Sequence, residues 1–153
     1  MGRLRVSIDI DAAPAEVWAV LSDVGSHVDW MEDAVAIRFS SDQTSGVGTE
    51  FDCDTRIGPF SLVDHMEITE WVPQRAMGVR HVGLVTGSGV MTLEPIGRGG
   101  GSGFTGTRFA WTERLTFPWW MGGPLGATAS RPVLGRVWRR NLENLRAIVE
   151  QRP

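Results

Sequence analysis

The two ends of the chain constrain its fold more than any other part of the sequence. From residue 3 to residue 10, apolar and polar residues alternate, which is the period of a strand with one buried face. Near the other end, apolar residues recur at steps of three and four, as on the buried face of a long helix. The residues with this helical spacing are Val133, Leu134, Val137, Trp138, Leu142, Leu145, Ile148 and Val149. Strand patterns dominate the stretch between, so the sequence predicts a sheet that packs against one long helix.

The C-terminal helix is expected to run from Val133 to Glu150, a length of about 27 Å. Its other face mixes arginines with acidic residues, so we expect that face to be solvated rather than to bind a partner. Pro132 is expected to mark the start of the helix or a kink, because residues 125–130 are small and only weakly helical.

A second, shorter helix is predicted directly after the first strand. Pro14 is tolerated in a first helical turn, and Glu16 follows where the helix dipole favours a carboxylate, which indicates a helix of two turns. Residues 23–30 predict another short helix or a turn. A strand pattern then follows, with Val35 on the same face as Ile37.

The middle of the chain predicts an antiparallel meander. The segments that alternate as strands are 50–57, 62–69, 77–81, 91–93 and 109–115. Short links between them favour hairpins. The sequence therefore predicts one α+β domain over residues 1–153, in which a curved antiparallel sheet of about six or seven strands wraps around the C-terminal helix. The expected order is strand, helix, helix, strand, meander and helix.

The glycine-rich run at residues 97–103 is expected to be a hairpin tip. A phosphate-binding loop would end in Lys followed by Ser or Thr and would lead into a helix, whereas this run leads into a strand pattern.

Composition excludes several classes of function. With 153 residues, of which 42% are hydrophobic, the chain can build a core without help. Its formal charge of −3 and the lack of any basic run argue against nucleic acid as a partner. Cys53 is the single cysteine, and the polar N-terminus has neither the apolar core of a signal peptide nor a spanning segment. A cytoplasmic location and no stable membrane insertion are therefore expected.

Alternation along the strands predicts which polar side chains point to the inside of the sheet. Asp64, His81 and Glu113 are the ionisable residues that this parity selects, although one bulge would reverse the facing of a strand. They lie among apolar residues, as expected for a small-molecule pocket. A desolvated carboxyl beside an imidazole could exchange a proton with a bound carbonyl, which suits enolisation, aldol closure or loss of water. The alternative is that each group is hydrogen bonded for structural reasons or reaches water at a strand end.

Tryptophans divide into two groups. Trp18, Trp71 and Trp138 are expected to pack in the core or between sheet and helix. Trp30, Trp119 and Trp120 fall in predicted loops and suggest a contact surface. The run 117–121 either gates the mouth of the cavity or packs under the helix.

No metal or cofactor is expected from the motifs. His27 and His65 are expected near the surface, and no histidine or cysteine has metal-ligand spacing. Cys53 has no histidine and acid arrangement that would make it a nucleophile.

Three segments carry a resemblance to a known superfamily. They are residues 8–23 (Ile-Asp-Ile-Asp-Ala-Ala-Pro-Ala-Glu-Val-Trp-Ala-Val-Leu-Ser-Asp) with Trp30, residues 68–75 (Ile-Thr-Glu-Trp-Val-Pro-Gln-Arg), and Leu93-Glu94-Pro95 before Gly106-Thr107. With these motifs the whole chain resembles the helix-grip, or SRPBCC, superfamily of polyketide cyclases and dehydratases, START domains and pollen-allergen-like proteins. The resemblance implies a helix-grip fold and a hydrophobic ligand held between the sheet and the last helix. It implies equally a carrier or sensor and an enzyme, since one fold hosts many functions.

The main functional hypothesis is a binding protein for a lipid-like, aromatic or polyketide metabolite. The expected ligand-binding residues are Trp30, Phe51, Met66, Met77, Val79, Met91, Phe109, Trp111, Trp119, Trp120, Val137 and Trp138. The alternative is a cyclase or dehydratase that uses His81 with Asp64 or Glu113. Tyrosine is absent and only one inward histidine is expected, so few groups could transfer protons, which favours binding. A third hypothesis is a protein-interaction module that uses the convex-face residues Glu50, Asp52 and Asp54. The oligomeric state is left open by the sequence.

Overall fold

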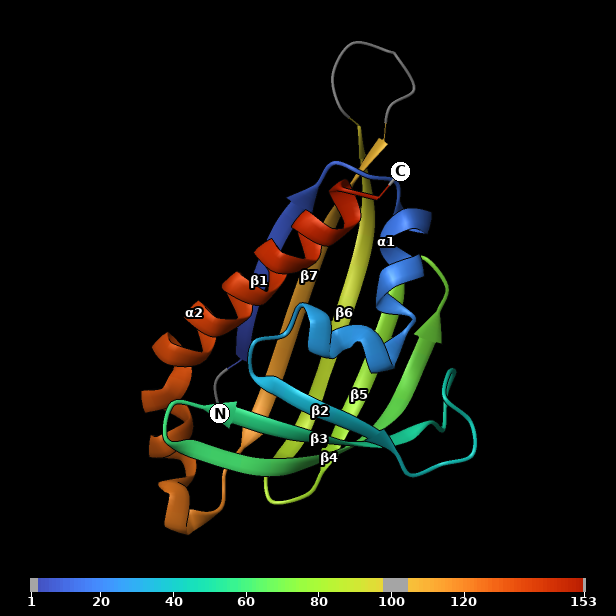
Figure 1. Ribbon diagram of the computed structural model, residues 1–153. Coiled ribbons are helices and arrows are strands. Elements are labelled where there is room, and N and C mark those ends of the chain that lie inside the picture. The colour runs from blue at the N-terminus through green and yellow to red at the C-terminus, as the bar shows by residue number, and fades with distance from the viewer. Residues whose placement is uncertain (1–2, 98–104, 153) are drawn as a thin grey trace.

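A curved antiparallel sheet wraps around one long helix in the computed structural model, which describes residues 3–97 and 105–152 (Figure 1). The strands are β1 (Arg3–Ile10), β2 (Ala34–Phe39), β3 (Glu50–Ile57), β4 (Phe60–Val72), β5 (Ala76–Val82), β6 (Thr86–Gly97) and β7 (Thr105–Thr116). The α-helices are α1 (Pro14–Leu21) and α2 (Gly123–Glu150), and the 3-10 helices are η1 (Val24–Asp29) and η2 (Trp119–Met121). The expected glycine-rich hairpin tip lies outside the described residues from position 98 to position 104.

The seven strands form a single sheet in the order β1-β7-β6-β5-β4-β3-β2. Each neighbouring pair is antiparallel, so β2 to β7 form the predicted meander and β1 closes the far edge against β7. Two register shifts, at Ala34/Ala36 in β2 and at Ile68/Glu70 in β4, interrupt the pairing. Bulges of this kind bend a strand and increase its twist, which helps the sheet to curve around the helix.

The bulge in β2 makes the expected facing of Val35 wrong. Ala34 pairs with Thr55 and Ala36 pairs with Asp54, so Val35 is the additional residue of the bulge. Its side chain is exposed, whereas Ala34 is buried. Strict alternation placed Val35 on the inner face with Ile37, but one inserted residue reverses that assignment.

Helix α2 begins ten residues earlier than the sequence predicts, at Gly123, and Pro132 lies inside it. The small residues that made this segment look weakly helical allow it to pack closely. A Cβ atom on Gly126 would lie 2.2 Å from the backbone oxygen of Met121, so only glycine fits there. Gly122 has a φ of 95° and reverses the chain between η2 and α2.

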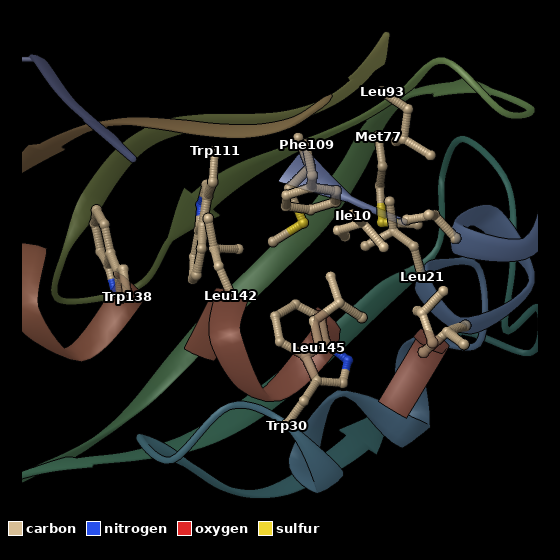
Figure 2. Close-up of a cluster of buried hydrophobic side chains, with 14 of the residues drawn as sticks. Ile10, Leu21, Trp30, Met77, Leu93, Phe109, Trp111, Trp138, Leu142 and Leu145 are labelled. Atoms are coloured by element: carbon tan, nitrogen blue, oxygen red, sulfur yellow. The ribbon is translucent and has the colours of Figure 1, made fainter. Parts of the chain in front are cut away.

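The core lies along the C-terminal half of α2. Leu142, Leu145 and Val149 project from this half and are buried. They pack with residues from β1, α1 and β7, among them Ile10, Leu21 and Phe109 (Figure 2). The N-terminal half of α2 contributes few buried residues, which leaves that end of the space between helix and sheet open to other use.

His27 is buried, which corrects the expectation that it lies near the surface. It sits in η1, and its Nε2 donates to the backbone oxygen of Leu21, 2.7 Å away. Burial lowers the pKa of His27 to about 4, against a smaller opposing effect of this hydrogen bond. His27 is therefore a neutral structural group, whereas His65 is exposed and pairs with Asp52 on the outer face of the sheet.

Candidate functional site

A cavity of about 700 Å³ separates the N-terminal half of α2 from the inner face of the sheet. Its volume falls in the range of small-molecule sites in proteins. Strands β3 to β7 supply most of its wall, and α2 supplies Ser130, Val133, Leu134 and Trp138. The exposed side chains of Phe60, Leu84 and Trp120 also line it, so the cavity opens to the surface at their end of the molecule.

The structure brings eight of the twelve proposed ligand-binding residues to this cavity. They are Phe51, Met66, Met77, Val79, Met91, Trp111, Trp120 and Trp138. These residues come from five different strands, η2 and α2, and parity along the strands explains why the strand residues point inward. Trp111 and Trp138 stack with ring centroids 4.8 Å apart and join the wall of β7 to that of α2.

The other four proposed residues lie elsewhere. Trp30 and Phe109 are fully buried in the core cluster and do not line the cavity (Figure 2). Val137 is half-buried against the core, because it is one residue away from the inward Trp138 and therefore turned around the helix. Trp119 is 87% exposed and points to solvent, in contrast to the adjacent Trp120.

Asp64, His81 and Glu113, selected by strand parity, meet in the cavity wall. Nδ1 of His81 lies 2.9 Å and 3.0 Å from the two carboxylate oxygens of Asp64. Nε2 of His81 lies 3.0 Å from Oε2 of Glu113, whose Oε1 accepts a hydrogen bond from Nε1 of Trp111 at 3.0 Å. We call Asp64, His81 and Glu113 the acidic cluster. All three line the cavity.

The acidic cluster depends on the absence of a side chain at one position of β6. His81 is on β5 and Glu113 is on β7, so β6 lies between them. Gly89 of β6 pairs with Glu113, and a Cβ atom on Gly89 would lie 2.3 Å from Oε1 of that carboxylate. Because Gly89 has no side chain, the imidazole and the carboxylate can meet above the intervening strand.

Electrostatics make His81 the cationic centre of the cluster. The exposed fractions of the side chains are 7% for His81, 4% for Glu113 and 15% for Asp64. Burial alone lowers the pKa of His81, but hydrogen bonds to the two carboxylates and their charges outweigh it and raise the pKa to about 10. One imidazolium between two carboxylates leaves one net negative charge, which faces an apolar cavity.

A second carboxyl site, which the sequence reasoning missed, lines the same cavity. Asp33 precedes β2, and its Oδ1 accepts a hydrogen bond of 2.7 Å from Nδ2 of the buried Asn141. Burial raises the pKa of Asp33, and the hydrogen bond from Asn141 opposes this rise. Asn141 also accepts a hydrogen bond from the backbone N–H of Glu32, which fixes α2 to the start of β2. A polar residue on the apolar face of the predicted helix was the available signal for this site.

Cys53 also lines the cavity, and its chemistry is that of a buried thiol. Burial raises the pKa of Cys53 to about 11, so the thiol stays protonated at neutral pH and is a poor nucleophile. In the described part of the chain, no group of three His, Cys, Asp or Glu side chains is arranged to hold a metal ion.

Comparison with known proteins identifies the family of the chain. A family model described as polyketide cyclase/dehydrase and lipid transport matches residues 1–150. The chain belongs to this family. No curated protein matches the chain. Within the part that the structure describes, the family member has no helix long and apolar enough to cross a membrane.

Solved structures share the helix-grip fold of this family member. A protein of Thermus thermophilus superposes with a TM-score of 0.77 at 17% identity and covers 97% of both chains. The ZhuI aromatase/cyclase of a Streptomyces species gives 0.73 at 17% identity, over 99% of this chain and 94% of the other. A START superfamily protein of Mycobacterium smegmatis gives 0.72 at 11% identity, over 97% of both chains.

The two buried histidines are expected to titrate on opposite sides of neutrality. In an NMR titration of the histidine rings, His27 should change protonation near pH 4 and His81 near pH 10. The interactions that raise the pKa of His81 also stabilise the folded state. Their contribution is fully present below the pKa of the unfolded-state imidazole, about 6.5. That contribution should decline as the pH rises from there through 10, because the folded state then holds a proton that the unfolded state has lost. A His81 midpoint near 6.5 would contradict the charged cluster.

Proposed function

We propose that this family member binds a small hydrophobic molecule in the cavity between its sheet and α2. The observation that carries the proposal is a cavity of about 700 Å³ whose wall is mostly apolar and which opens to the surface. A void of this size lined by methionine and aromatic side chains forgoes dispersion contacts that a bound apolar molecule would supply. Methionines such as Met66, Met77 and Met91 adapt their shape readily, which suits a ligand that fills an irregular space.

The chemistry of the acidic cluster favours binding over catalysis. A general base needs a free nitrogen lone pair near its working pH. Both ring nitrogens of His81 instead face carboxylates at 2.9 to 3.0 Å, and its pKa is raised to about 10. His81 therefore keeps its proton at neutral pH and acts as the cation that permits Asp64 and Glu113 to be buried.

The charges of the cavity wall also favour one kind of ligand head group. Asp33, Asp64 and Glu113 line the cavity, and among the described lining residues no lysine or arginine accompanies them. Asp64 is the most exposed member of the acidic cluster and keeps lone pairs that His81 does not use. We infer a ligand that carries a hydrogen-bond donor, either an ammonium or a hydroxyl group, rather than a carboxylate.

Blocking the cavity is expected to abolish binding. Val79→Trp places an indole on the cavity wall, whereas Val82→Trp makes the same change at an exposed position of the same strand. Isothermal titration calorimetry with dodecanol should show a loss of affinity of at least about tenfold for Val79→Trp and none for Val82→Trp, because a filled site excludes the ligand. Circular dichroism checks that both variants are folded. Equal affinities in the two folded variants would remove the cavity as the site.

The head-group preference is tested with three ligands of the same chain length. Wild-type protein should bind dodecylamine and dodecanol more tightly than dodecanoate. Asp64→Asn should reduce the preference for the amine over the carboxylate by about tenfold, the effect of one nearby charge. Asp54→Asn is the matched control, because Asp54 pairs with Arg38 on the outer face of the sheet. A wild-type preference for dodecanoate would refute the head-group inference while leaving hydrophobic binding intact.

A cyclase or dehydratase is the second candidate, favoured by the contact of an inward imidazole with two carboxylates. In this case the imidazolium would act as a general acid toward a bound carbonyl. Turnover of a poly-β-carbonyl substrate by the wild-type protein, lost in a folded His81→Gln variant, is the expected result for this function. Turnover that is absent from the wild-type protein would exclude this substrate class.

A further inference from the structure

Large apolar side chains are concentrated on the surface around the cavity opening. We call this set the mouth rim: Phe60, Leu84, Trp119, Trp120, Leu125 and Val133. Trp119, Leu125 and Phe60 are 87%, 82% and 67% exposed. Phe60, Leu84, Trp120 and Val133 line the cavity as well, so the rim is continuous with its interior. All the exposed tryptophan, phenylalanine and leucine side chains of the described residues belong to this rim, whereas the other large exposed apolar residues are single valines.

Three separate segments converge to form the mouth rim. They are the β3–β4 turn, the β5–β6 turn, and η2 with the first turns of α2, which lie toward the same end of the molecule (Figure 1). An exposed patch of aromatic and leucine side chains lowers the solubility of a protein. Such patches mark interaction sites in soluble domains.

The charge around the mouth rim is positive although the whole chain is acidic. Residues 55–63, 82–93 and 114–137, which form the rim segments and the strand and helix ends next to them, contain four arginines and no aspartate or glutamate. Arg56, Arg114 and Arg131 are exposed on these segments. The exposed segments around the opening are therefore basic, whereas the carboxyl groups nearby, those of Asp33, Asp64 and Glu113, line the cavity itself.

We infer that the mouth rim docks on the surface of a lipid bilayer that contains anionic lipids. Tryptophan, phenylalanine and leucine with neighbouring arginines are the side chains that bind the boundary between head groups and acyl chains. Arginine adds attraction to anionic head groups. A second copy of the chain fits less well, because two rims face to face would bring like charges together without acidic partners. Docking in this way turns the cavity opening toward the acyl chains, and ligand entry from the bilayer rests on the proposed binding function.

Vesicle sedimentation tests the docking with the full chain. The protein should bind vesicles of phosphatidylcholine and phosphatidylglycerol in equal parts, and should bind phosphatidylcholine alone at least about tenfold more weakly. Raising the salt concentration should weaken the first interaction, since arginine and head-group charges are then screened. Absence of binding, or equal salt-independent binding to both vesicles, would overturn the inference.

Matched variants separate the rim from other exposed residues. Trp119→Ala combined with Leu125→Ala should weaken binding to anionic vesicles by about tenfold or more, because both side chains are exposed and available for insertion. Val47→Ala combined with Val72→Ala removes exposed apolar groups from the strand ends opposite the β3–β4 turn and should have no effect.

Arg56→Gln with Arg131→Gln should weaken binding, whereas Arg75→Gln with Arg152→Gln, at the other end, should not. Equal effects within either pair of double variants would contradict a docking face at the rim.

Two further outcomes distinguish docking by the rim from lipid uptake and from dimerisation. Val79→Trp, designed to block the cavity, should bind vesicles as the wild-type protein does. Loss of sedimentation in that variant would mean that vesicle lipid is taken into the cavity and that the rim itself does not dock. Analytical ultracentrifugation that shows a dimer weakened by the Trp119 and Leu125 changes, together with no vesicle binding, would assign the rim to a second copy instead.

Discussion

The contact between the C-terminal half of α2 and the sheet determines how the rest of the molecule is arranged. Leu142, Leu145 and Val149 are buried against the core and hold this half of the helix close to β1. Asn141 adds hydrogen bonds to Asp33 and to the backbone of Glu32 and fixes the rotation of the helix. Because a helix is stiff, anchoring one half sets the distance of the other half from the sheet. The cavity occupies the space that remains between the other half of the helix and the sheet, less the volume of the side chains that line it.

The acidic cluster is stable only as a unit. Burying a charged group is expensive unless it is paired, and removal of one partner from a buried pair leaves an uncompensated charge. Here His81 compensates Asp64 and Glu113 together, Trp111 satisfies the remaining oxygen of Glu113, and Gly89 provides the room. The indole of Trp111 in turn stacks on α2. Trp111 thus contacts both the acidic cluster and α2, so a change in the cluster is expected to alter the packing of the helix.

Properties set by strand periodicity could be predicted from the sequence, and properties set by tertiary contacts could not. The inward facing of the acidic cluster follows from alternation alone. Val35 was assigned to the wrong face because a bulge depends on how two strands pair, and the role of Gly89 depends on strand order. His27 was expected near the surface because a 3-10 turn has no periodicity that reveals its buried face. Asp33 was missed because only the loop conformation before β2 directs it to Asn141. The early start of α2 was missed because glycine and proline lower helix propensity, which close packing on η2 overrides.

The surface around the opening and the interior of the cavity differ in charge, and this gradient connects the two proposals. Arg56, Arg114 and Arg131 are exposed on the segments near the opening, and the acidic cluster and Asp33 are part of the interior wall. An anionic bilayer attracts the arginines of the rim and also concentrates amphiphiles that carry a positive head group. A cationic head group of such an amphiphile is compensated by lipid phosphates at the bilayer. After transfer it would be compensated by the carboxylates of the cavity wall. A carboxylate amphiphile would meet attraction at the rim and repulsion inside. The carboxylates of the interior would therefore determine which head group is bound, and the residues of the rim would determine which membrane is bound.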